Sequence, residues 1–460
     1  MSLWPYIFSL PPSYERVEVM KTLFKSEAAL KILKSMKRDE KNYQNEIIKK
    51  LNFSNKTIIN QLKKMVKMGI LEEHEEKIVK EGVAYWVKWY KLTDVGKWLH
   101  YFLINEKEID KKEFGKILNE LTYFYSLGLK YFCKNFKIPL EKFYENIEYS
   151  WIEDYLIKEK NKIADVIVFG TNTVDFILRS NIENEKTYTE NLEIRPGGAG
   201  ANIAVFLSKL GLKTALATKI GIDNFTRFLI EDLLKRKVIC RNIIIDKKLK
   251  NPISIIFLSK NGNKKIIYIN GKDRALSITP EEIDWDLVKK AKAIVICESF
   301  IEVAEELIKY SLKNNIKIFY RPSYPQVIIN TEKIIELCKN MDALILGKEE
   351  KEEIEKNGYD IKQLCKNIVI THGANECIIY ENGKKYLIKP LEIKVKEDLC
   401  GKDAFTAGFI SAYLEGKNIK ESVTQGIYAA AITISKGGCR EGMPDKKELM
   451  EFSRRIFNDS

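Results

Sequence analysis

The chain has 460 residues, of which 45% are hydrophobic and 31% are charged, and its formal net charge is +13. This length predicts two or three domains, and no apolar run approaches the ~20 residues that a membrane-spanning helix needs. Residues 1–10 lack the basic start and the cleavage site of a signal peptide, so we expect a cytoplasmic protein with no membrane partner. The basic charge favours nucleic acid as a partner, although an Ile- and Lys-rich composition alone also produces such a charge.

The eight cysteines are scattered without a Cys-x-x-Cys pair, and two of the three histidines lie in the first quarter of the chain, far from the third. This pattern argues against a metal site and predicts reduced thiols. Cys297 and Cys377 stand in apolar runs, so we expect both in the core.

Three helices and a hairpin are predicted in the first hundred residues. Apolar stripes indicate helices over 26–37, 44–51 and 55–68, the last with Ser54 as its N-cap and Gly69 at its end. A polar stretch and a strand over 84–92 follow, and Thr93 and Asp94 begin a further helix.

This layout, with the runs Leu51–Leu62 and Tyr90–Thr93, resembles the winged helix-turn-helix of ArsR- and MarR-type regulators over residues 20–103. The resemblance implies binding to double-stranded DNA, although such modules also bind proteins. The exposed face of the third helix has amides and ammonium groups but no carboxylate, which suits base edges and phosphates. In the hairpin, four glutamates between 72 and 76 would repel phosphate, which leaves Lys77, Lys80 and Lys88 for contact. The candidate DNA-binding residues are Ser54, Asn55, Lys56, Thr57, Asn60, Lys63 and Lys64.

Residues 106–161 read as a helical, aromatic-rich connector between a first domain over 1–105 and a third over 162–460. The connector is either a packed spacer or a dimer interface. We favour a homodimer, because helix-turn-helix proteins usually bind two half-sites as two-fold dimers.

From residue 163 onward, buried strands alternate with helices, which predicts a doubly wound α/β sheet. The predicted strands are 164–169, 214–219, 293–297, 316–320, 343–346 and 368–371.

The run Gly197–Gly211 contains the most specific local motif. It is not a dinucleotide fingerprint, because it lacks the third glycine and follows Arg195-Pro196, where we expect no strand. Over residues 163–455 the chain resembles the ribokinase-like (PfkB) sugar and nucleoside kinases, which implies a small β lid near 177–195 and 251–270. The residues that the resemblance assigns to the substrate or effector are Asn172, Asp175, Gly197, Gly198, Asn202 and Asp403.

The second family signature places a Gly-Ala-Gly-Asp run at a helix N-terminus that cradles phosphate, which implies Asp403 as the catalytic base. Two of its glycines are replaced by Cys400 and Lys402, at a cost of ~1–2 kcal/mol if positive φ is required there. Conversely, the Lys402 ammonium could bind phosphate as a point charge. The Asn-x-x-Glu motif begins with Gly347 here, and the nucleotide loop ends in Glu376 in place of glycine. The candidate nucleotide and phosphate residues are Gly401, Lys402, Thr371, Gly373 and Glu350, with ATP and Mg²⁺ as cofactors if that site works.

We therefore predict a transcriptional regulator whose kinase-like domain senses a sugar or nucleoside through an intact substrate pocket beside a degenerate ATP site. The alternative is an active ATP-dependent kinase with a regulatory DNA-binding domain, and a third option is a bifunctional protein. Gly347 and Lys402 discriminate between the hypotheses.

Overall fold

The computed structural model divides into two compact units, Met1–Tyr144 and Glu145–Ser460, which are described separately. It describes residues 25–101 except 81, isolated positions between 102 and 150, and residues 151–458 except 154, 180–190, 260–263, 270–276 and 374. Most of the predicted connector and its dimer interface lies outside the described residues. In the described part of the chain, every helix is too short or too polar to cross a membrane.

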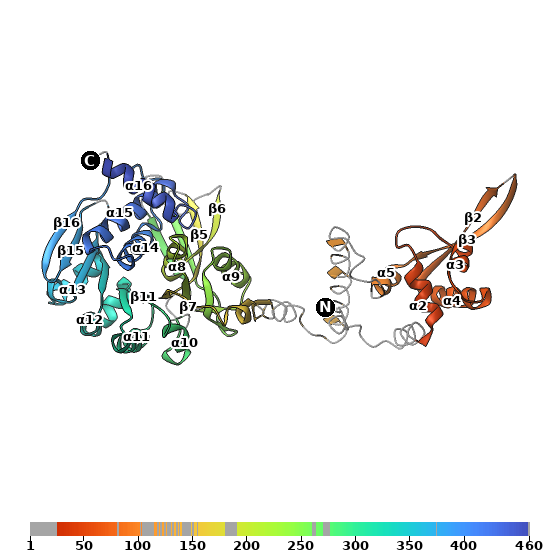
Figure 1. Ribbon diagram of the computed structural model, residues 1–460, viewed down its shortest axis with the longest axis horizontal. Coiled ribbons are helices and arrows are strands. Elements are labelled where there is room, and N and C mark those ends of the chain that lie inside the picture. The colour runs from red at the N-terminus through yellow and green to blue at the C-terminus, as the bar shows by residue number, and fades with distance from the viewer. Residues whose placement is uncertain are drawn as a thin grey trace. The chain divides into compact units, whose positions relative to one another are not determined.

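Between residues 25 and 101, four helices pack against a three-stranded antiparallel sheet of order β1-β3-β2, and the long hairpin projects away from the helices (Figure 1). The predicted helices and the predicted strand are confirmed, and Ser54 caps α4 by accepting a hydrogen bond from the Thr57 N–H at 3.1 Å. Buried stripes of α2 and α4 form the core. The elements are α2 (Glu27–Ser35), β1 (Asn42–Tyr43), α3 (Gln44–Lys50), α4 (Asn55–Lys67), β2 (Leu71–Lys80), β3 (Val83–Leu92) and α5 (Asp94–Tyr101).

The second unit contains a nine-stranded sheet of order β16-β15-β14-β13-β12-β11-β4-β7-β8. All neighbours from β14 to β8 are parallel, as the predicted α/β pattern requires, and β15 and β16 add an antiparallel edge. The strands are β4 (Val166–Phe169), β7 (Thr214–Gly221), β8 (Ile239–Asp246), β11 (Ala293–Cys297), β12 (Lys317–Arg321), β13 (Ala343–Gly347), β14 (Asn367–Thr371), β15 (Cys377–Glu381) and β16 (Lys384–Ile388).

Helices cover both faces of this sheet (Figure 1). Successive side chains of β4 alternate between the faces, so Val166 and Val168 join one apolar cluster while Ile167 and Phe169 join the other. The first cluster includes residues of α8 (Ala199–Lys209), α9 (Thr226–Lys235), α14 (Gly401–Leu414), α15 (Ile419–Lys436) and α16 (Lys446–Asn458). The second includes residues of α10 (Trp285–Val288), α11 (Ile301–Asn314), α12 (Tyr324–Cys338) and α13 (Lys348–Lys356).

A separate four-stranded sheet of order β10-β9-β5-β6 is the predicted lid. It contains β5 (Thr173–Arg179), β6 (Leu192–Gly197), β9 (Ile253–Leu258) and β10 (Lys264–Ile269). Our expectation that no strand precedes the glycine pair is wrong, because β6 runs through Arg195 and Pro196. Proline is tolerated there because β6 is an edge strand, where one side of the backbone needs no ladder hydrogen bond.

The prediction of reduced thiols is wrong for one pair of cysteines. Cys400 and Cys439 form a disulfide with their Cα atoms 5.2 Å apart. It joins the start of α14 to the loop between α15 and α16, two segments that the fold brings together from 39 residues apart. Cys297 and Cys377 are buried core residues, as predicted.

Candidate functional site

The polar residues of the second unit gather where the parallel strands end. Because β4, β11, β12, β13 and β14 are parallel neighbours, their carboxyl ends share one edge of the sheet, where α/β proteins bind ligands. In spatial order, the residues at or just beyond these ends are Asn172, Glu298, Arg321, Gly347 and Thr371. The predicted substrate side and the predicted nucleotide side are therefore adjacent.

Asp175 and the glycine pair meet across the lid strands, as predicted for a substrate pocket. A side chain on Gly197 would overlap the Asp175 carboxylate, and Gly198 has φ +91° with no room for a Cβ beside Thr171. Burial raises the pKa of Asp175, which hydrogen bonds from Thr173 and Ser254 oppose. The glycines therefore leave space around one buried carboxylate.

Asn172 has an unsatisfied side chain. It is 2% exposed, and both of its polar side-chain atoms are buried without a hydrogen-bond partner among the described residues. Buried amides are almost always paired, so this one calls for a bound ligand or water. Asn172 thus lies just beyond the end of β4, and its side-chain amide has a donor and an acceptor without a partner among the described residues.

Asp403 lies in the first turn of α14 and is held at both oxygens. The Asn202 amide donates to Oδ2 at 2.8 Å, and the Arg321 guanidinium donates to Oδ1 at 2.7 Å. Asp403 is close enough to Asp175 to contribute, as the smallest of the named causes, to the raised pKa of that residue. The structure therefore brings together Asp175, Asn202 and Asp403, which lie far apart in sequence.

Arg321, Glu298 and Arg440 were missed from the sequence. Arg321 ends β12, and Glu298 follows β11 with a left-handed φ of +49°. Burial raises the pKa of Glu298, while a hydrogen bond from the Thr171 hydroxyl opposes the rise. Arg321 and Glu298 could have been predicted as site residues, because both stand at the carboxyl ends of predicted strands. Arg440 lies in a loop far along the chain, and nothing in its local sequence marks it.

On the nucleotide side, the Glu350 and Lys402 side chains both approach Gly347. The Gly347 N–H donates to Glu350 Oε2 at 2.9 Å. A Cβ built on Gly347 would stand 2.5 Å from that oxygen and 2.8 Å from Lys402 Nζ. Both atoms are at the ends of flexible side chains, so a larger residue at 347 would require Glu350 and Lys402 to shift.

The altered Gly-Ala-Gly-Asp signature has no positive φ at the two positions where glycine is replaced. Cys400 has φ −122° as the residue before α14, and Lys402 is an ordinary helical residue without positive φ. A side chain on Gly401 would stand 2.8 Å from Asp398 Oδ1 and would require that carboxylate to shift. In the nucleotide loop, Thr371 donates its hydroxyl to the Leu346 carbonyl at 3.2 Å, and Gly373 has φ +57°.

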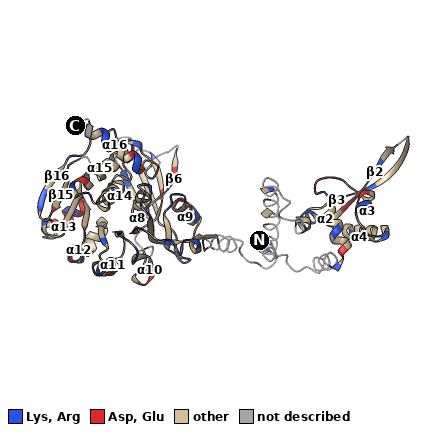
Figure 2. Ribbon diagram, viewed as in Figure 1, with Lys and Arg blue, Asp and Glu red and all other residues tan. Residues whose placement is uncertain are grey.

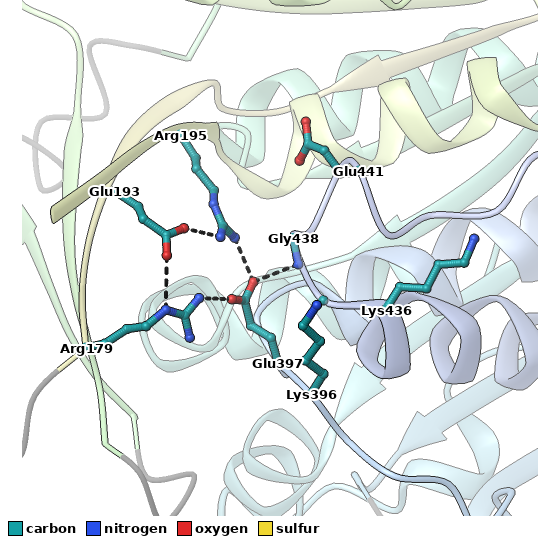
Figure 3. A pocket seen from close by; sticks show the side chains of 9 residues that line it. Arg179, Glu193, Arg195, Lys396, Glu397, Lys436, Gly438 and Glu441 are labelled. Atoms are coloured by element: carbon teal, nitrogen blue, oxygen red, sulfur yellow. Dashed lines mark hydrogen bonds and ion pairs between the residues drawn. The ribbon is translucent and has the colours of Figure 1, made fainter. Parts of the chain in front are cut away.

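A pocket of about 520 Å³ lies between the lid and the segment that precedes α14 (Figure 3). Arg179 and Arg195 reach from the lid to the buried Glu397, which also accepts the Gly438 N–H at 3.0 Å. Burial would raise the pKa of Glu397, yet the two guanidinium groups outweigh burial and hold it below its usual value. Two ion pairs to the buried Glu397 thus connect the lid to the segment that precedes α14.

In the first unit, the candidate DNA-binding residues lie together on α4. Ser54 and Thr57 bond each other at 2.7 Å as the helix cap. The remaining candidates are exposed, and Figure 2 marks the basic ones in blue; they are Asn55, Lys56, Asn60, Lys63 and Lys64. Lys88 is paired with Glu73 at 2.7 Å and Glu75 at 3.1 Å, so it is less available to phosphate than we predicted.

Among the residues that the structure describes, no group of three or more His, Cys, Asp or Glu side chains could hold a metal ion. Glu350 is placed to bind Mg²⁺ only together with nucleotide phosphates, which is the usual way that such ions are held.

Comparisons with known proteins agree with this geometry. Residues 163–446 match the family described as pfkB family carbohydrate kinase, and residues 20–107 match an uncharacterized protein family conserved in archaea, DUF2250. The chain is 27% identical over 329 residues to the 5-dehydro-2-deoxygluconokinase of Clostridium tetani, covering 65% of this chain and 95% of that protein. A 5-dehydro-2-deoxygluconokinase of Bacillus thuringiensis is 25% identical over 325 residues, covering 65% of this chain and 97% of that protein.

Solved structures share the fold of the second unit. The ribokinase of Thermotoga maritima matches with a TM-score of 0.54 and 23% identity, covering 64% of this chain and 100% of that one. The nucleoside kinase of Methanocaldococcus jannaschii matches with a TM-score of 0.54 and 20% identity, covering 64% of this chain and 99% of that one.

Proposed function

The chain belongs to the pfkB family of carbohydrate kinases, and from this premise we propose that it is an active ATP-dependent kinase that phosphorylates a hydroxyl of a sugar acid. This replaces our first hypothesis, a sensor with a degenerate ATP site, because two of the departures that suggested degeneracy, Gly347 and Lys402, lie close together in space. Asp403 takes the proton of the substrate hydroxyl while the oxygen of that hydroxyl attacks the γ-phosphorus of ATP, and ADP leaves.

The observation that carries the proposal is the first turn of α14. It holds Asp403 next to the substrate residues and brings the end of the Lys402 side chain close to Gly347, so a base and a cation flank the helix N-terminus. Backbone N–H groups and the helix dipole there favour the negative charge of a phosphoryl group in transfer. The Lys402 ammonium adds a full positive charge on the side where the nucleotide phosphates would lie.

Arg321 supports an acidic substrate. Its Nη1 binds Asp403, and the side chain keeps 18% exposure within the site. A guanidinium has five N–H donors in a fork that matches a carboxylate, so the donors not used on Asp403 can bind one. The curated relatives are named for a gluconate derivative, which is a sugar acid. We therefore expect the carboxylate to lie towards Arg321 and the hydroxyls towards Asp175 and Asn172.

The test is ADP formation by the full chain with Mg²⁺-ATP and a panel of keto sugar acids, neutral sugars and nucleosides. We expect sustained ADP release with at least one sugar acid and a lower KM for acids than for the matched neutral sugars. If a sugar raises the melting temperature but no compound is turned over, the result would contradict the kinase and support the sensor hypothesis.

A second function, DNA binding as a winged helix-turn-helix, is favoured by the exposed face of α4. That helix begins at a capped N-terminus, presents amides and lysines, and contains no acidic residue. A long β2–β3 hairpin in the same unit corresponds to a wing. Together these features support contacts of Asn55 and Asn60 with bases and of the lysines with phosphates.

DNA binding is tested by fluorescence anisotropy of the full chain on genomic duplex fragments over a range of salt concentrations. Lys56→Ala and Lys63→Ala should each reduce the slope of log K against log salt by about 0.9, and Asn60→Ala should change the sequence preference. Lys313→Ala, an exposed lysine of α11, is the matched control and should leave the slope unchanged. Absence of binding to every fragment at low salt would eliminate this function.

We also propose a cytoplasmic homodimer, since the reaction uses intracellular ATP and helix-turn-helix proteins usually bind DNA as two-fold dimers. Sedimentation equilibrium of the full chain should give a mass of about two chains; a monomer at micromolar concentration would contradict the dimer.

A further inference from the structure

Arg440 is the largest fully buried side chain that the structure describes, and it sits behind the substrate residues. It lies between α15 and α16 with 1% exposure. Its guanidinium donates from Nε to Asn202 Oδ1 at 2.8 Å and from Nη2 to the Gly197 carbonyl at 2.8 Å, and Nη1 pairs with Asp232 of α9. One side chain thus fixes α8, α9 and the end of lid strand β6.

The contact with Asn202 decides which way that amide points. A guanidinium can only donate, so the amide oxygen must face Arg440. The amide nitrogen then faces the other way, and it donates to Asp403 Oδ2 at 2.8 Å. A reversed amide would place two donors against each other and an oxygen against a carboxylate. The series of contacts from Asp232 through Arg440 and Asn202 to Asp403 therefore permits only one orientation of the Asn202 amide.

We propose that Arg440 is a positioning residue that orients the catalytic base Asp403 through the Asn202 amide. The inference rests on the proposed kinase function. Arg440 does not bind substrate, because its charge is matched by Asp232 and its side chain is buried behind Asn202. The loop that carries it is attached to the start of α14 by the bond between Cys439 and Cys400.

This arrangement differs from that of Arg321, which contacts Asp403 directly. Burial lowers the pKa of Arg440, while the ion pair with Asp232 opposes the change. A lysine at 440 would keep the charge opposite Asp232 but, as a single point donor, could not hold Asn202 and the Gly197 carbonyl in the same fixed fork. Arg440→Lys therefore removes the orientation and retains the buried charge.

A double-mutant cycle in kcat separates this role from a structural one. Arg440→Lys should lower kcat roughly 10- to 100-fold in the wild-type background, which is typical of a small misplacement of a reacting group. In an Asn202→Ala background the same substitution should change kcat less than about 2-fold, because the amide through which it acts is gone. Equal losses in both backgrounds, or no loss in either, would overturn the proposal.

Arg241→Lys is the matched control. Arg241 is a largely buried arginine of the same unit whose partners, Asp284 at 2.6 Å and the Lys162 carbonyl, are not site residues. It should keep kcat near the wild-type value, which checks that loss of a buried guanidinium is not by itself sufficient.

A second readout does not depend on turnover. In protein labelled with ¹⁵N-asparagine, the Asn202 side-chain amide, assigned by its loss in Asn202→Ala, should exchange slowly with solvent. Exchange should accelerate in Arg440→Lys and stay slow in Arg241→Lys. If the wild-type protein phosphorylates nothing, the proposed function fails while this exchange still tests the positioning; unchanged exchange in Arg440→Lys would refute it.

Discussion

The two halves of the site preserve their chemistry in different ways. On the substrate side, Asp175, Asn202 and Asp403 remain as the family pattern has them, and surrounding groups hold them in place. On the nucleotide side, the residues at 347 and 402 both differ from the family pattern, and the end of the Lys402 side chain lies close to Gly347. The first half keeps the residues of the family pattern, whereas in the second two replaced residues are neighbours in space.

This difference shows why departures from a motif should not be counted one at a time. A glycine in place of asparagine and a lysine in place of glycine each look like a loss. In the structure, the ammonium of Lys402 lies beside the Gly347 position. A coupled change of this kind favours a site that still binds phosphate over one that has decayed.

The bond between Cys400 and Cys439 joins the start of α14 to the loop that carries Arg440, and removing it should have the largest effect. Closing a loop of 39 residues predicts a loss of about 4 kcal/mol in the stability of the second unit when the bond is broken. Calorimetry of the full chain with and without reductant should show a lower melting temperature after reduction. The Cys400→Ser/Cys439→Ser variant is the control, since reductant should not shift it further. A wild-type transition that ignores reductant would contradict the bond.

The coupled pair on the nucleotide side can be broken and rebuilt. Gly347→Asn should lower kcat/KM for ATP about 100-fold, because the new side chain collides with Lys402 and Glu350. Lys402→Gly should lower it by a similar factor through loss of the cation. The double variant, which restores the family pair, should recover most of the activity. Losses that multiply in the double variant would show that the two positions are independent.

The substrate side should respond to acid in a measurable but smaller way. Burial raises the pKa of Asp175, so this carboxylate becomes protonated at a higher pH than an exposed aspartate. Because its ionised form accepts the substrate hydroxyls, KM for the sugar should rise as the pH falls, beginning above the ordinary range for aspartate. Glu298, whose pKa burial also raises, faces the same site and should add to the trend. Asp175→Asn should bind weakly with a flatter profile; an unchanged KM in that variant would remove Asp175 from the site.

Much of the fold could be predicted because it follows local rules. The strand from Ala293 to Cys297 was placed by its apolar run, and Ser54 by its capping chemistry. The disulfide could not be predicted, since eight cysteines offer many possible pairs and only the folded chain brings residues 400 and 439 together. Arg440 was not predicted from the sequence for a similar reason, because its partners come from three distant elements. The proximity of Gly347 and Lys402 is likewise a contact in space, which no local motif records.

The most direct test of the account is ADP formation from Mg²⁺-ATP and a sugar acid by the wild-type chain and by Asp403→Asn. We predict turnover by the wild type and a decrease of about 10²- to 10⁴-fold in kcat for the variant, with both proteins folded to the same melting temperature within a few degrees. Equal turnover in the two proteins would contradict the assignment of Asp403, and none in the wild type with any sugar acid would contradict the kinase.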